Sequence, residues 1–135
     1  MKNAYLNAKL TEMIYMRQPL GFATPGDERQ VYCLLKALYG LKQAGHCWYQ
    51  RICEVFAKFL YTHCTMEHCV FHKCMNGEII IIVITVDDLT LTSSNKYLLD
   101  TCKDELQSKF NIMDLGPIHW LLGVEVKRDW YHASI

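Results

Sequence analysis

A run of apolar residues near the middle of the chain is its most pronounced pattern. Ile79 to Ile84 consists of six consecutive β-branched residues with no polar position between them. Such a run is typical of a strand that lies in the middle of a sheet and is covered on both faces. After Asp87 and Asp88 the pattern resumes as Leu89 to Thr92, where leucine and threonine alternate. We therefore expect a hairpin of Glu78 to Val86 and Leu89 to Thr92, whose tip carries two adjacent carboxylates.

A second hairpin is predicted directly before this one. Cys69 to Met75 has the composition of a strand, and Asn76-Gly77 separates it from Glu78. Asn-Gly between two apolar runs is a strong signal for a two-residue hairpin turn. The three predicted strands would then form an antiparallel meander.

Two stretches have the period of an amphipathic helix. The first runs from Ala44 to about Tyr61, and its predicted inward residues are Trp48, Ile52, Val55, Phe56, Phe59 and Leu60. Ser93-Ser94 offer an N-cap for the second, Tyr97 to Phe110, with inward residues Leu98, Leu99, Cys102, Leu106 and Phe110. We interpret the aromatic stripe of the first helix as core packing.

Shorter patterns complete the chain around these elements. Residues 18–30 contain two prolines and two glycines and predict a loop. Four segments have strand composition, and Gly123 interrupts the last of them: Met1 to Asn7, Met13 to Met16, Val31 to Lys36, and Ile118 to Val126. This order of elements predicts an α+β fold, with helices packed on one face of an antiparallel sheet.

Composition and charge limit the classes of protein. With 135 residues, half of them hydrophobic, the chain has the size and core of one globular domain. Its 14 basic and 14 acidic residues cancel, so the whole chain has no electrostatic footprint for nucleic acid. No apolar run approaches the roughly 20 residues of a membrane span, and no secretory signal is visible. Seven cysteines without framework spacing predict reduced thiols, so we expect an intracellular protein without membrane contact.

The acidic tip has two interpretations. Two adjacent carboxylates repel each other, and water solvates them if the tip is simply an exposed turn. Carboxylate oxygens at the end of a rigid strand also suit Mg²⁺, which binds through a few carboxylates together with phosphates and water. The two aspartates by themselves leave both interpretations open.

A cluster of histidines and cysteines gives a competing hypothesis. Six residues of the types that bind zinc fall within twelve positions: His63, Cys64, His68, Cys69, His72 and Cys74. Their spacing contains no paired Cys-x-x-Cys motif, and alternation along a strand would place Cys69 on one face with His72 and Cys74 on the other. Buried thiols and surface histidines are the preferred interpretation, with a small zinc-binding module as the alternative.

Several longer motifs resemble a known family. The chain looks like the palm portion of the reverse transcriptase of copia-type LTR retrotransposons from Met1 to about Asp129. Residues 1–129 would thus form a partial reverse transcriptase domain, and residues 130–135 a C-terminal tail. The matching stretches, in order, are Lys2 to Asn7, Ile14 to Pro19 with Gly21-Phe22, Lys36 to Ala44 leading into Trp48-Tyr49, Val86-Asp87-Asp88, Asp114-Leu115-Gly116, and Leu122 to Val126.

The resemblance implies an RNA-directed DNA polymerase with a polymerase palm-like sheet, acting on an RNA template, a DNA primer and a dNTP. Asp87 and Asp88 fall on the paired catalytic aspartates, which in the family help to hold two Mg²⁺ ions. Tyr5 falls on the aromatic position beneath the incoming sugar. Gln43 falls on a glutamine of the nucleotide-binding motif at a helix start, where N–H groups favour phosphates. Lys42 is a lesser substrate-binding candidate, and other domains of the polyprotein are implied partners.

The chain also departs from the family pattern. The family has a third metal-binding aspartate two residues before the position of Lys2, and no residue of these 135 matches it. Thr85 stands where an aromatic residue or histidine is usual, Ala8 where glycine is usual, and His46 where arginine is usual. We therefore expect a truncated copy without the fingers region that is weakly active or inactive alone. A non-catalytic remnant that binds nucleic acid or a partner is a further alternative.

Overall fold

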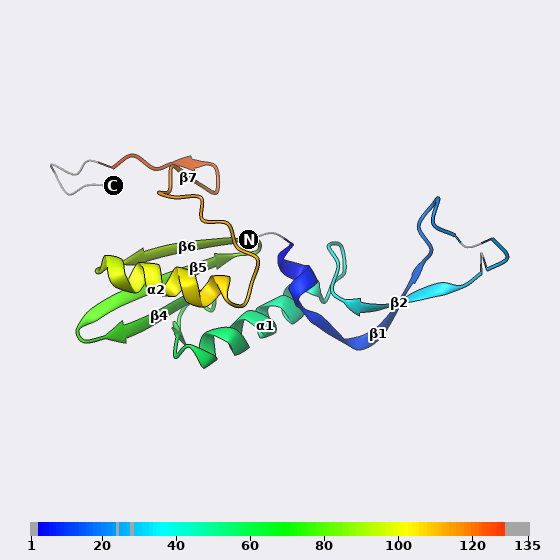
Figure 1. Cartoon of the computed structure of the whole chain (residues 1–135), viewed down its shortest axis with the longest axis horizontal. Coiled ribbons are helices and arrows are strands. Elements are labelled where there is room, and N and C mark those ends of the chain that lie inside the picture. Colours follow the sequence, from blue (N-terminus) through cyan, green and yellow to red (C-terminus); the bar gives the residue numbers. More distant parts are fainter. Residues whose placement is uncertain (1–2, 24, 28, 129–135) are drawn as a thin grey trace.

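Residues 3–23, 25–27 and 29–128 are described by the computed structural model, and they form three separate antiparallel sheets with two α-helices (Figure 1). The predicted tail at residues 130–135 lies outside the described residues. In chain order the elements are η1 (Ala4–Asn7), β1 (Lys9–Arg17), β2 (Val31–Lys36), α1 (Ala44–Lys58), β3 (Thr62–His63), β4 (Val70–Met75), β5 (Glu78–Thr85), β6 (Asp88–Ser93), α2 (Lys96–Gln107), β7 (Trp120–Leu121) and β8 (Val124–Glu125). The predicted α+β class is confirmed.

The largest sheet has the strand order β3-β4-β5-β6, and every neighbouring pair is antiparallel. The predicted meander is therefore present, with β3 added at its edge. Asn76 and Gly77 form the turn between β4 and β5, and both have positive φ, 52° and 82°. That conformation is what a two-residue turn between right-twisted strands requires, and asparagine and glycine reach it most readily.

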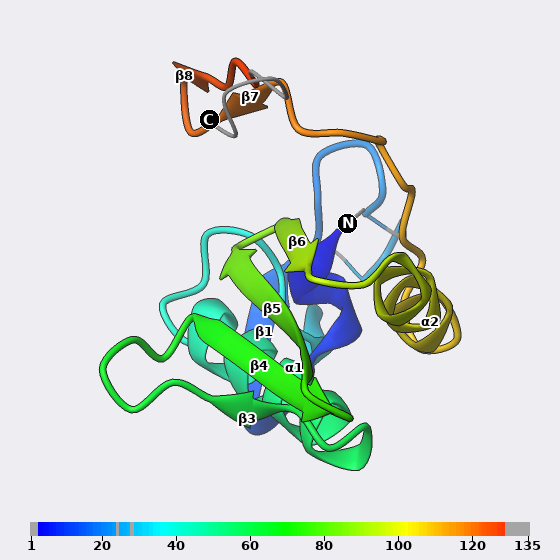
Figure 2. The same cartoon turned by 90° about the vertical axis from the view of Figure 1, so that its left-hand side faces the viewer.

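Both helices cover the same face of this sheet, as predicted (Figure 2). Phe71 and Lys73 lie two positions apart in β4 and so share one face. The ring of Phe56 in α1 lies 4.7 Å from that of Phe71, while Glu105 in α2 forms a 3.2 Å ion pair with Lys73. The core between the helices and the sheet is a single cluster that includes Trp48, Ile52, Phe56, Phe71, Ile82 and Leu106.

The central strand β5 corrects one prediction. Its position between β4 and β6 is confirmed, but only one of its faces is covered. Ile80, Ile82 and Ile84 are buried, whereas Ile79 on the other face is 38% exposed. A run of β-branched residues fits a strand that is buried on both faces, yet the run carries no information about where the helices pack. Here they occupy one side.

The first residues also differ from the prediction of a strand from Met1 to Asn7, whose first two positions lie outside the described residues. Asn3 has a left-handed φ of 57°, and the chain then forms the 3-10 helix η1. The side-chain amide of Asn7 donates to the main-chain oxygen of Asn3 at 3.0 Å, which closes the turn. Strand β1 then runs well beyond the predicted Met13 to Met16, and with β2 it forms a ribbon that projects from the body (Figure 1).

The helix ends are set by individual residues. Helix α1 stops at Lys58 and not near Tyr61, because Leu60 adopts a left-handed φ of 63° and turns outward. Leu60 is therefore exposed, contrary to its predicted inward position. The N-cap of α2 is Asn95 and not Ser93-Ser94, since its side chain accepts a 2.8 Å hydrogen bond from the N–H of Tyr97.

The segment Ile118 to Val126, predicted to have strand composition interrupted at Gly123, contains a short hairpin. Leu122 and Gly123, with φ of 50° and 83°, form the turn between β7 and β8. Neither α1 nor α2, the helices of the described ranges, is long and apolar enough to cross a lipid bilayer.

Candidate active site

The acidic hairpin tip lies between β5 and β6. Its turn is shifted by one residue from the predicted Asp87-Asp88. Thr85 pairs with Asp88, so Val86 and Asp87 are the two turn residues and Asp88 already belongs to β6. Asp87 is half-buried and Asp88 is exposed. Alternation along β6 places Asp88 on the face opposite Leu89, away from the helices. The two carboxylates are therefore adjacent in sequence but lie in different surroundings.

The carboxylate of Asp87 is held by two donors from the N-terminal part of the chain. Its Oδ1 accepts a 2.9 Å hydrogen bond from the main-chain N–H of Ala4 and a 2.5 Å hydrogen bond from the hydroxyl of Tyr39. The bond to Asp87 raises the pKa of the Tyr39 hydroxyl, because the carboxylate stabilises the protonated phenol. These contacts join η1, the loop before α1 and the hairpin tip.

The predicted sugar-facing residue Tyr5 lies at the same place. Its ring centroid is 4.6 Å from that of Tyr39, with the planes tilted by 39°. Its hydroxyl lies against Gly45 in the first turn of α1, 3.8 Å from where a Cβ on that glycine would stand. The structure thus brings Tyr5 and Asp87 together, with Tyr39 between them.

The other two predicted substrate residues are arranged differently. Gln43 is the N-cap residue of α1, but its side chain makes no capping bond; its Nε2 donates to Glu12 Oε2 at 2.9 Å. This contact ties the start of α1 to strand β1. Lys42, the preceding residue, is exposed. Gln43 and Lys42 lie two and three residues before Gly45, the residue beside the Tyr5 hydroxyl, and the side chain of Gln43 is directed to Glu12.

Two residues that sequence reasoning missed help to build the tip. Tyr39 is not among the site residues that the sequence predicts, and Trp48 is predicted only as an inward residue of the first helix. The indole Nε1–H of Trp48 donates to the main-chain oxygen of Val86 at 3.2 Å. Tyr39 lies 48 positions from its partner Asp87, and Trp48 lies 38 from Val86, so no local spacing could reveal either contact. Their place in the family-like stretch from Lys36 to Tyr49 was the one available signal.

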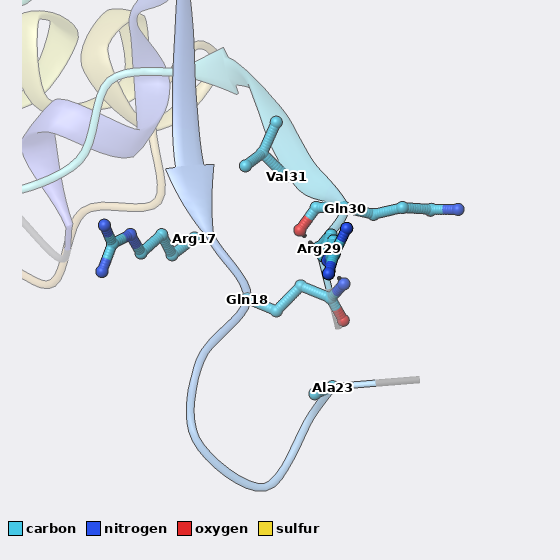
Figure 3. A pocket seen from close by; sticks show the side chains of 6 residues that line it. All are labelled: Arg17, Gln18, Ala23, Arg29, Gln30 and Val31. Atoms are coloured by element: carbon cyan, nitrogen blue, oxygen red, sulfur yellow. Dashed lines mark hydrogen bonds between the residues drawn. The ribbon is translucent and has the colours of Figure 1, made fainter. Parts of the chain in front are cut away.

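A recess of about 400 Å³ lies elsewhere, at the base of the loop between β1 and β2 (Figure 3). Gln18 closes this loop by donating from Nε2 to the main-chain oxygens of Asp27 at 2.7 Å and Gln30 at 3.1 Å. The lining residues are Arg17, Gln18, Ala23, Arg29, Gln30 and Val31. None of the predicted site residues belongs to this recess.

The histidine and cysteine cluster does not assemble into a zinc site in the part of the chain that the structure describes. The rings of His63 and His68 stack at 5.7 Å, while His72 and Cys74 lie on strand β4. Among the described residues, no group of three histidine, cysteine, aspartate or glutamate side chains is placed to hold a metal ion. The same is true of the acidic tip, where the described residues supply two such side chains, Asp87 and Asp88.

Comparison with known proteins identifies the family. A family model described as reverse transcriptase (RNA-dependent DNA polymerase) matches residues 1–134. The retrovirus-related Pol polyprotein from transposon TNT 1-94 of Nicotiana tabacum is 36% identical over 129 residues, which cover 95% of this chain and 10% of the relative. The chain belongs to the reverse transcriptase family of copia-type LTR retrotransposons.

Further relatives of this reverse transcriptase sequence agree. The retrovirus-related Pol polyprotein from transposon RE1 of Arabidopsis thaliana is 33% identical over 126 residues, covering 93% of this chain and 9% of the relative. The transposon Ty5-1 protein of Saccharomyces cerevisiae is 31% identical over 123 residues, covering 91% of this chain and 40% of the relative. The chain therefore spans about a tenth of the two plant polyproteins. No solved structure was found that matches it.

Proposed function

We propose that this chain forms the acidic part of a palm-type polymerase site that copies RNA into DNA. Its substrates would be an RNA template, a DNA primer and a dNTP, and the other domains of a Pol polyprotein would be its neighbours. Family membership supports the class of reaction. The observation that supports placing the reaction at this hairpin is the Asp87 carboxylate, which two donors hold at the tip of a β-hairpin beside Tyr5.

The residues at the tip fit Mg²⁺ in chemical type. Mg²⁺ prefers oxygen ligands, and proteins commonly hold it through one or two carboxylates while water and substrate phosphates complete the shell. Asp87 and Asp88 would be the protein ligands. Bound Mg²⁺ supplies charge neutralisation at the nucleotide phosphates and aligns the attacking and leaving oxygens.

The remaining residues would bind and orient the nucleotide. The ring of Tyr5, fixed between Tyr39 and the first turn of α1, would lie beneath the sugar and exclude a 2′-hydroxyl group by its bulk. Gln43 and Lys42 would approach the phosphates at the start of α1, where the helix end is positive. For Gln43 this requires its hydrogen bond to Glu12 to open.

We further propose that these 135 residues alone are weakly active. A two-metal site needs enough ligands to hold two ions about 3.5–4 Å apart. In the ranges that the structure describes, the acidic tip offers two carboxylates, and one oxygen of Asp87 already accepts two hydrogen bonds.

A primer-extension assay tests both statements. The purified chain, Mg²⁺, a poly(rA) template with an oligo(dT) primer, and dTTP should give slow incorporation that Asp87→Asn abolishes. Asp100→Asn, which removes an exposed carboxylate of α2, is the matched control and should not change the rate. Incorporation that survives Asp87→Asn would contradict the proposed site. Fast incorporation that Asp87→Asn abolishes would leave the site standing and contradict the proposal that these residues alone are weakly active. Salt-sensitive RNA binding that persists in Asp87→Ala, without incorporation, would instead indicate a non-catalytic binding remnant.

A further inference from the structure

Tyr39 connects the two principal residues of the proposed site. Its hydroxyl donates to Asp87 Oδ1 at 2.5 Å, and its ring packs 4.6 Å from the ring of Tyr5. Tyr39 comes from the loop between β2 and α1, so it reaches Asp87 from a different segment than Ala4, which also donates to the same oxygen. One side chain thus contacts the carboxylate through its polar end and Tyr5 through its aromatic face.

The two donors to Asp87 differ in what a substitution can remove. The N–H of Ala4 belongs to the main chain, so every substitution of Ala4 except proline keeps it. The Tyr39 hydroxyl, in contrast, is a single group that a substitution can remove. Removing it leaves the ring and hence its packing against Tyr5. The hydroxyl and the ring can therefore be tested separately.

We propose that Tyr39 is a positioning residue, whose hydroxyl fixes the orientation of the Asp87 carboxylate for a divalent cation and whose ring fixes the position of Tyr5. This inference rests on the proposed function, because it takes Asp87 as a metal ligand. A carboxylate that is oriented before the cation arrives loses less side-chain freedom on binding. Hydrogen-bond partners of metal-ligating groups typically account for 10–100-fold in metal affinity when they are removed.

If the Tyr39 hydroxyl competed with the cation instead of orienting the carboxylate, its removal would change the metal affinity in the opposite direction. A phenol that competes with the cation for Oδ1 would weaken metal binding, so its removal would strengthen binding. A held carboxylate predicts weaker binding after removal. The sign of the change in affinity therefore decides between orientation and competition.

The test is a titration of the whole 135-residue chain with Mn²⁺, followed by the electron paramagnetic resonance signal of the free ion. Tyr39→Phe should weaken Mn²⁺ binding about tenfold, and its melting temperature should match that of the original chain. Tyr39→Leu should weaken binding at least as much. Tyr15→Phe is the matched control, because the hydroxyl of Tyr15 is exposed on β1 and contacts Met13 Sδ at 3.8 Å; its Mn²⁺ affinity should not change.

A second measurement follows the ring of Tyr5. In a chain labelled with 3-fluorotyrosine, the ¹⁹F resonance of Tyr5, assigned with Tyr5→Phe, should shift in Tyr39→Leu and stay nearly unchanged in Tyr39→Phe. An unshifted Tyr5 resonance in Tyr39→Leu would overturn the role of the ring. Changes in stability alone would not separate the two variants in this way.

The outcomes also separate this inference from the proposed function. If Asp87→Asn abolishes Mn²⁺ binding but Tyr39→Phe binds with equal or higher affinity, the role of the Tyr39 hydroxyl is wrong and the metal site stands. If Asp87→Asn leaves Mn²⁺ binding unchanged, or if the original chain binds no Mn²⁺, the proposed metal site fails and this inference fails with it.

Discussion

The indole N–H of Trp48 donates a 3.2 Å hydrogen bond to the main-chain oxygen of Val86, which holds a buried helix residue against the tip of the acidic hairpin. Val86 has a left-handed φ of 47°, a conformation that a β-branched residue rarely adopts. Local backbone strain of this kind persists where the surroundings fix it, and it is common beside functional residues. Here it lies directly before Asp87.

The strain at Val86 predicts that Val86→Gly stabilises the protein by about 1 kcal/mol, because glycine has no Cβ to clash in the left-handed region. Little packing is lost, since Val86 is 47% exposed. Urea denaturation measures the change in the free energy of unfolding. Val124→Gly in β8 is the control, also exposed but without a positive φ, and it should not stabilise. A less stable Val86→Gly would show that the turn is not strained.

The ion pair between Lys73 and Glu105 predicts a large effect of removing one partner. The two side chains are only 14% and 18% exposed, and Glu105 also accepts a 2.9 Å hydrogen bond from Tyr61. Lys73→Met should destabilise the protein by about 2 kcal/mol, because it leaves a poorly solvated carboxylate unpaired. Combining it with Glu105→Gln, which keeps an acceptor for Tyr61, should restore part of that loss in a double-mutant cycle.

The matched control for this cycle is Lys127→Met, which removes the lysine of an exposed pair with Glu125 and should change stability by less than about 0.5 kcal/mol. An additive Lys73 and Glu105 cycle would mean that the ion pair does not couple the two elements it joins, β4 and α2.

The cysteines should differ sharply in reactivity. Cys102 is fully buried in α2, and burial raises the pKa of its thiol to about 11. Cys33 in β2 is exposed. Because the thiolate is the reactive form, iodoacetamide at pH 8 should modify Cys33 long before Cys102, as read by peptide mass spectrometry. Equal rates in the folded protein, with both slower than in urea, would contradict the burial of Cys102.

Stability should fall at alkaline pH. Burial is the main cause that raises the pKa of Tyr49 from 10 to about 12, and it raises the pKa of Tyr61 as well. For a group whose pKa is raised on folding, the unfolded chain releases its proton first. The stability is therefore complete below pH 10 and decreases as the pH rises from 10 towards 12.

Tyr49→Phe should make this alkaline decrease shallower, since one ionising group is removed, although it also loses the 2.9 Å hydrogen bond to the main-chain oxygen of His68. Tyr97→Phe, at an exposed position of α2, should leave the pH profile unchanged. The measurement is the midpoint of urea denaturation at several values between pH 8 and 11.5. An equal slope in all three proteins would contradict the raised pKa of Tyr49.

Local patterns predicted most of the elements correctly. The turn at Asn76-Gly77, the meander and both helices follow from residue types within a few positions of each other, and all are present. The prediction that both faces of β5 are covered was wrong, because the covering depends on where α1 and α2 pack and not on the strand itself. The predicted strand at the start was wrong because Asn3 and Asn7 close a turn that apolar content does not reveal.

The candidate site was predictable only in part. The sequence indicates that Asp87 is acidic and lies at a hairpin, and the resemblance adds Tyr5, Gln43 and Lys42. The contact that joins Asp87 to Tyr5 runs through Tyr39, which approaches from another segment of the chain. Such a contact depends on how the loop before α1 packs against η1. The side chain of Gln43 is likewise directed by Glu12 on a neighbouring strand.

The separate sheet of β1 and β2 has a mechanical consequence. Among the described residues the ribbon shares no hydrogen-bonded ladder with the four-stranded sheet, and at its base the N–H of Ala37 donates to the main-chain oxygen of Ala8 at 3.0 Å, directly after η1. The same short helix begins with Ala4, a donor to Asp87. A displacement of the ribbon would therefore be transmitted to the acidic tip through the four residues of η1, and also through Tyr39, which follows β2 and donates to Asp87.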